Sequence, residues 1–101
     1  METKNLNKKI PFAAHFHVSP NALAKAYPND QIAVVHLKTR RIQVLNQTAS
    51  RVWKLLVAGS SCGEIQESFS QEFKADANEI SADIDAILNL LEAEGLISID
   101  E

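Results

Sequence analysis

Residues 42–56, IQVLNQTASRVWKLL, change their hydrophobic period half-way along. Up to Leu45, β-branched residues alternate with others, which is the period of a β-strand. The apolar residues that follow recur at the three- and four-residue spacing of an amphipathic helix: Ala49, Val52, Trp53 and Leu56. Asn46 or Thr48 lies between the two patterns and is a suitable helix N-cap. The stretch therefore predicts a strand that runs directly into a helix.

Two further strands are predicted before this stretch. Residues 31–37 are rich in β-branched side chains, and residues 22–27 alternate larger side chains with alanines. A Pro-Asn-Asp turn at residues 28–30 separates them. The short polar connection at residues 38–40 joins the second strand to residues 41–45 as a hairpin. We therefore expect a three-stranded antiparallel sheet.

Two more helices are predicted after it. Gly59 ends the first helix, and Ser61 and Glu64 have the spacing of a capping box for the second. Asp76 or Asn78 caps the third helix, which Gly95 ends. The expected buried stripes are Cys62, Ile65, Phe69 and Phe73 on the second helix, and Ile80, Ile84, Ile87, Leu88 and Leu91 on the third. A short strand or extended tail follows at residues 96–99.

Strands followed by helices indicate an α+β fold, and this order is typical of a winged helix-turn-helix. The length of 101 residues is that of one domain. Residues 1–20 show no sustained period and are interrupted by Pro11 and Pro20. We expect them to be an N-terminal tail that packs late or not at all. The domain itself is then expected to span residues 21–101.

The composition is that of a globular cytoplasmic protein, with 46% hydrophobic and 23% charged residues. No apolar run approaches the roughly 18 residues of a membrane helix, and no secretory signal is recognisable. Residues 1–54 carry nine Lys or Arg and two acids, whereas residues 55–101 carry one base and eleven acids. This asymmetry predicts a polarised surface, unless the two halves neutralise each other where they pack.

The sequence offers few groups for catalysis or metal binding. Cys62, in the first turn of a helix, is either a reactive thiolate or, as we favour, a small buried apolar residue. His15, His17 and His36 are either a three-histidine zinc site or, more simply, unrelated. There is no phosphate-binding loop, nucleophile elbow or zinc-protease motif. We therefore expect no enzyme activity, no cofactor and no metal.

The third helix argues against nucleic acid as the ligand. The last helix of a helix-turn-helix motif enters the major groove, where basic side chains meet phosphates. Residues 78–94 contain no Lys or Arg. They contain five acids: Glu79, Asp83, Asp85, Glu92 and Glu94. We interpret Glu79, Asp83 and Asp85 as a solvated edge of this helix. A DNA-binding regulator that uses the basic hairpin is the second hypothesis.

The same helix has more apolar surface than one contact requires. A second stripe runs beside the buried one and consists of Asp83, Ala86, Ile87 and Leu90. Residues 41–45 are expected to form an edge strand. An open edge beside an apolar helix face is the setting in which a peptide adds as a strand. The alternative is that Ile87 and Leu90 complete the core.

The chain resembles the PqqD family over residues 22–98. The matching elements are Val34-Val35-His36-Leu37, Ile42-Gln43-Val44-Leu45-Asn46-x-Thr48-Ala49 with Val52-Trp53 and Leu55-Leu56, Gly59, Glu64-Ile65, Phe73, Asp83-Ile84 and Leu91-x-x-x-Gly95-Leu96-Ile97. PqqD-like domains are peptide-recognition elements for ribosomally made, post-translationally modified peptides, including the precursor in PQQ biosynthesis. The resemblance implies a non-catalytic chaperone that binds the leader of a precursor peptide by strand addition.

By position, the resemblance also implies the binding residues. The docking strand would be Arg41, Ile42, Gln43, Val44 and Leu45, and the helix wall would be Asp83, Ala86, Ile87 and Leu90. Arg40 and Arg41 would meet acidic leader residues, and Asp83 a basic or polar one. The implied second partner is a modifying enzyme, such as a radical S-adenosylmethionine enzyme, or a leader peptidase. A third hypothesis is a structural subunit that packs on an enzyme through the same face.

Overall fold

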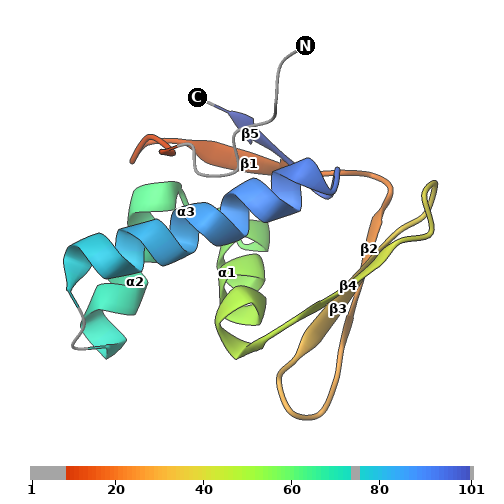
Figure 1. Ribbon diagram of the computed structural model, residues 1–101, viewed down its shortest axis with the longest axis horizontal. Helices are drawn as coiled ribbons and strands as arrows, with labels where there is room; N and C mark the ends of the chain where they lie inside the picture. The colour runs from red at the N-terminus through yellow and green to blue at the C-terminus, as the bar shows by residue number, and fades with distance from the viewer. Residues whose placement is uncertain (1–8, 74–75, 101) are drawn as a thin grey trace.

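Three strands and three helices follow one another as the sequence predicts (Figure 1). The computed structural model describes residues 9–73 and 76–100. The antiparallel sheet has the order β2-β3-β4, formed by β2 (Ala22–Ala26), β3 (Ile32–His36) and β4 (Ile42–Leu45). The helices are α1 (Gln47–Val57), α2 (Cys62–Glu72) and α3 (Ala77–Ala93). The α+β winged-helix prediction is confirmed.

Each helix begins at a residue whose side chain accepts a backbone N–H bond. The Asn46 side chain accepts from Ala49 N at 2.8 Å, and Asp76 accepts from Asn78 N at 2.8 Å. At α2 both halves of the predicted capping box are present between Ser61 and Glu64. These bonds satisfy donors that the first helical turn leaves without an intrahelical partner.

The N-terminal segment differs from the expected tail. Residues His15–Val18 form a strand, β1, which pairs antiparallel with β5 (Ile97–Asp100) as a second, two-stranded sheet. Ile10 and Ala14 each have only 1% of their surface exposed. Residues 9–20 therefore belong to the folded body. Residues 1–8 of the predicted tail lie outside the described residues.

This segment is fixed by the first turn of α2. The N–H of Cys62 donates to the carbonyl oxygen of Ala14 at 2.9 Å, and the N–H of Gly63 donates to that of Phe12 at 2.7 Å. A Cβ atom on Gly63 would lie 2.6 Å from the Phe12 ring, so glycine permits this close approach. The partners are about fifty positions apart, which is why local sequence patterns gave no sign of the contact.

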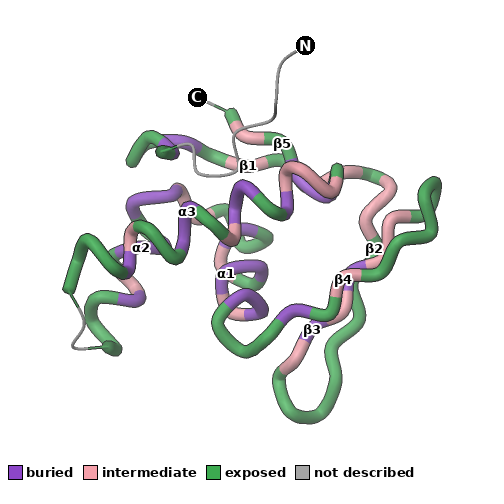
Figure 2. Tube along the Cα trace, in the orientation of Figure 1, coloured by how far each residue is buried: buried purple, intermediate pink, exposed green. Residues whose placement is uncertain are grey.

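The core lies between the three helices and the inner face of the sheet (Figure 2). Its most completely buried members include Val34, Val52, Ile65, Ile84, Leu88, Leu91 and Leu96. Trp53 is 5% exposed, as its place in the helical period predicts. The prediction that Phe73 belongs to the buried stripe of α2 is wrong. Phe73 follows the last turn of the helix and is 50% exposed.

A buried serine joins the sheet to α1. The N–H of Ile32 donates to Ser50 Oγ at 2.9 Å, and this hydroxyl donates to the carbonyl oxygen of Leu45 at 3.2 Å. Ser50 thus bridges the ends of β3 and β4 where their ladder stops, and it pairs the Ile32 N–H and the Leu45 carbonyl oxygen. The bridge fixes the position of β4 relative to the first turn of α1.

Among the described residues, no helix combines the length and the apolar character needed to cross a membrane.

Candidate functional site

β4 is an edge strand of the sheet in the described part of the chain, as predicted. The pairing of β4 with β3 determines which backbone groups of β4 point away from the sheet. The N–H of His36 donates to the carbonyl oxygen of Arg41 at 2.9 Å. In an antiparallel ladder the residues that bond to the neighbouring strand alternate, so Gln43 bonds inward as Arg41 does. The backbone groups of Ile42 and Val44 therefore face the open edge.

An ion pair and a shared hollow place α3 along this edge. Arg41, just before β4, forms an ion pair with Glu94, just after α3, with 3.1 Å between Nε and Oε1. Thr48, just after β4, lines a hollow of about 210 Å³ together with Asp83. α3 therefore runs antiparallel to β4. Asp83 lies at the hollow, and Ile87 and Leu90 lie between the hollow and the ion pair. The three residues share one helical face, because they follow the three- and four-residue spacing of a helix.

The apolar residues of this face are not fully buried in the core. Leu90 is 42% exposed, and Ile87 packs against the core while remaining partly exposed. The alternative in which both residues complete the core therefore fails for Leu90. Asp83 and Ala86 are exposed. Ala86 contributes to a different hollow on the next flank of α3, shared with Lys9 and Ser81.

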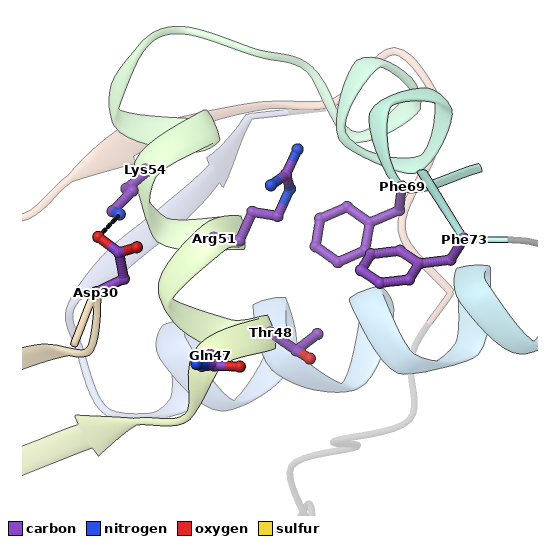
Figure 3. Close-up of a pocket in the computed structure, with 7 residues that line it drawn as sticks. All are labelled: Asp30, Gln47, Thr48, Arg51, Lys54, Phe69 and Phe73. Atoms are coloured by element: carbon purple, nitrogen blue, oxygen red, sulfur yellow. Dashed lines mark hydrogen bonds and ion pairs between the residues drawn. The ribbon is translucent and has the colours of Figure 1, made fainter. Parts of the chain in front are cut away.

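A wider hollow adjoins the Asp83 end of this face (Figure 3). Its volume is about 390 Å³, and its lining is Asp30, Gln47, Thr48, Arg51, Lys54, Phe69 and Phe73. The rings of Phe69 and Phe73 are 5.7 Å apart, and the Arg51 guanidinium lies 5.7 Å from the Phe69 ring centre. The sequence analysis did not predict this hollow. The sequence feature that could have indicated this hollow is the aromatic residue Phe73 at the predicted end of α2.

The charges around the edge are already partly paired. Arg41 is held by Glu94, and Arg51 forms an ion pair with Glu72. Arg40, predicted beside Arg41 as a contact for acidic leader residues, occupies the hairpin turn with a positive φ of 62°. Asp83 stays exposed at the other end of the α3 face. The two ends of the face thus differ in charge.

Cys62 is the buried apolar residue that we favoured. Its side chain is completely buried. Burial raises the pKa of the Cys62 thiol, and the nearby charge of Asp85 raises it further. The Gln66 amide, 3.5 Å from Sγ, acts in the opposite direction and is the smaller influence. A thiol in this environment is not activated as a nucleophile.

The three histidines do not converge. His17 Nε2 lies 2.6 Å from Asp100 Oδ2 across the β1–β5 pair. His36 Nδ1 accepts backbone N–H bonds from Lys38 and Thr39 in the hairpin turn. Within residues 9–73 and 76–100, no group of three His, Cys, Asp or Glu side chains is placed to hold a metal ion.

The prediction that Asp85 lies on a solvated edge of α3 is wrong. Its side chain is 8% exposed, and the backbone N–H of Ile10 hydrogen-bonds to its carboxyl group. The Oδ1 atom is buried without a hydrogen-bond partner among the described residues. Burial raises the pKa of Asp85, and the Ile10 bond and the Lys9 charge oppose this shift. The folded state therefore binds a proton at Asp85 more tightly than the unfolded chain does.

The variant Asp85→Asn is expected to remove part of the pH dependence of stability. Since the folded pKa is raised, the contribution of Asp85 is most favourable below its unfolded pKa and is lost as the pH rises through the folded pKa. One carboxyl contributes at most about 1.4 kcal/mol per pH unit. Denaturant unfolding between pH 4 and 8 should show a flatter profile for this variant. Asp83→Asn, exposed on the same helix, is the control; equal profiles for both variants would contradict the assignment.

The fold and the site define a winged-helix α+β domain with an open sheet edge beside an exposed apolar helix face. A family model described as "Coenzyme PQQ synthesis protein D (PqqD)" matches residues 31–97, from the start of β3 to the start of β5. The chain belongs to the PqqD family. No curated protein matches it.

Two solved structures share the fold. "TbiB1 in Complex with the TbiA(beta) Leader Peptide" superposes with a TM-score of 0.75 and 26% identity over 80% of this chain and 93% of that one. "Lasso peptide synthetase B1 complexed with the leader peptide" superposes with a TM-score of 0.76 and 18% identity over 83% of this chain and 98% of that one. The second likeness shows the fold alone.

Proposed function

We propose that this domain binds the leader region of a ribosomally made precursor peptide as an additional strand on β4. The observation that carries the proposal is the open edge of β4, which runs beside the exposed apolar face of α3. In strand addition the backbone ladder supplies affinity, and side-chain contacts supply specificity. The solved structure with 26% identity is a complex with a leader peptide, which supports the same ligand class here.

The geometry gives each part of the peptide a role. The groups of Ile42 and Val44 that face outward form the ladder with the added strand. Every second peptide side chain then points toward α3, where Ile87 and Leu90 offer apolar surface. Asp83 is free to attract a basic or polar residue at one end of the added strand. At the other end, Arg41 is ion-paired with Glu94 but still exposes guanidinium N–H donors to a peptide.

The proposed role is recognition rather than catalysis. The chain would hold the precursor and present it to a modifying enzyme or to a leader peptidase. The described residues contribute ladder groups, apolar surface and charge at the site, and these suffice for binding. A nucleic-acid ligand is less compatible, because the solvent-facing side chains of α3 include Glu79 and Asp83.

The test is an amide-shift titration of the labelled chain with the leader of a precursor encoded beside its gene. We expect a Kd of about 1 μM, equivalent to about −8 kcal/mol. The shifts should be confined to residues 40–46 and 83–91. Ile87→Glu should weaken binding more than about tenfold, because it places a carboxylate against the apolar side chains of the peptide.

Val57→Glu is the matched control, because Val57 is an aliphatic residue of α1 with 55% exposure outside the site. It should leave the affinity unchanged. Unchanged affinity in Ile87→Glu, or shifts away from β4 and α3, would reject the site. Duplex DNA at low salt provides a second titration, and binding there would favour the regulator hypothesis.

A further inference from the structure

The outer face of the sheet, opposite the core, is apolar and exposed. The strand registers align two rows of side chains across this face: Leu23–Val35–Ile42 and Lys25–Ala33–Val44. Leu23 is 57% exposed, Ile42 63% and Val44 67%. Five of the six residues in these rows are therefore apolar on a surface that meets solvent.

The apolar side chains of this face do not belong to the core. The buried residues of β3 and β4 have the opposite parity: Ile32 is 5% exposed, Val34 0% and Leu45 3%. Since successive side chains of a strand point to opposite faces, Ile42 and Val44 lie on the side away from these residues. Val44 also forms a wall of a shallow hollow that includes Tyr27 and Gln31.

The open edge of β4 connects this face to the proposed peptide site. The residues whose backbone groups face the edge, Ile42 and Val44, are also the residues whose side chains lie on the outer face. In a strand added to this edge, every second side chain would point toward α3. The intervening side chains would lie beside Ile42 and Val44, within the contact distance of cross-strand neighbours.

We propose that Ile42 and Val44 are specificity-determining residues that select the outward-facing side chains of the bound peptide. This inference rests on the strand addition under Proposed function. β-Branched or aromatic residues are selected at two peptide positions two residues apart, because such pairs stabilise neighbouring strands. Selection is stronger beside Ile42, which pairs with Val35, than beside Val44, which pairs with the smaller Ala33.

The experiment selects phage-displayed random dodecapeptides on the full chain. The wild type should enrich β-branched or aromatic residues at two positions separated by one residue. Ile42→Lys should enrich Asp or Glu at one of these positions by about two- to fivefold, the factor that a cross-strand pair supports. Val44→Lys should do so at the position two residues away. Leu23→Lys, on the same face but two strands from the edge, is the matched control and should leave the selected pattern unchanged.

The outcomes separate this inference from the proposed function. The variant Val44→Pro blocks the backbone at the edge of β4. Peptides that still bind this variant therefore bind at another site. If the wild type selects no peptide, or only peptides that still bind Val44→Pro, strand addition is rejected and this inference with it. If the selected peptides require the edge but their pattern is the same for the wild type and both lysine variants, only the inference about Ile42 and Val44 is overturned.

Discussion

Ile10→Ala is expected to lower the free energy of unfolding by about 2–5 kcal/mol, the usual cost of truncating a large buried aliphatic residue. Ile10 is 1% exposed although it precedes every predicted element of the domain. Its carbonyl oxygen lies 3.9 Å from Cys62 Sγ, and its N–H bonds to the Asp85 carboxyl group. The Ile10 side chain belongs to the buried core, so its truncation removes core contacts and leaves a cavity. Denaturant unfolding measures the loss.

Phe12→Ala is the matched control in the same segment. Phe12 is larger than Ile10, but it is 66% exposed, so its truncation removes less buried surface. We expect a loss of less than about 1 kcal/mol. If Ile10→Ala costs as little as Phe12→Ala, residues 9–14 do not pack as described, and the expectation of an N-terminal tail would be restored.

Val44→Pro is expected to abolish peptide binding while the fold is kept. Proline removes the N–H of Val44, which faces the open edge, and places its ring where the added strand would lie. A carbonyl group of the peptide loses its donor, which costs about 2–4 kcal/mol together with the lost bond. This corresponds to roughly a 30- to 1000-fold increase in Kd. Calorimetric titration with the leader peptide measures it.

Gln43→Pro distinguishes the edge from the interior of the ladder. The N–H of Gln43 points toward β3, so proline there breaks a bond within the sheet and should destabilise the fold by about 3 kcal/mol. Val44→Pro should change the free energy of unfolding by less than about 1 kcal/mol, because proline is tolerated on the free side of an edge strand. Full-affinity binding to Val44→Pro would exclude strand addition on β4.

Much of the geometry of the candidate site could be predicted because its parts are local. The alternation up to Leu45 and the helical period after Ala49 place an edge strand before α1. The spacing of Asp83, Ile87 and Leu90 places them on one helical face, because three- and four-residue spacing depends only on helix geometry. The structure keeps Asp83, Ile87 and Leu90 beside β4 and puts Ala86 in a separate hollow.

Two predictions, those for Asp85 and Phe73, were wrong for physical reasons that the hydrophobic pattern does not show. Asp85 resembles its exposed neighbours in sequence, and only its bond to Ile10 and its place under the N-terminal segment show that it is buried. Phe73 fits the period of α2, but the helix ends before its ring reaches the core. For Asp85 the deciding contact involves a residue far away in the chain, whereas for Phe73 the end of the helix decides.

The sequence by itself determined the order of strands and helices, the helix caps and the apolar faces, since these depend on backbone geometry and on neighbours within about four residues. The tertiary structure decided which surfaces remain open. It placed β1 beside β5, buried Ile10 under α2, and left β4 without a neighbouring strand on one side among the described residues. Burial and pairing across many positions depend on which faces meet, and local propensity does not encode that choice.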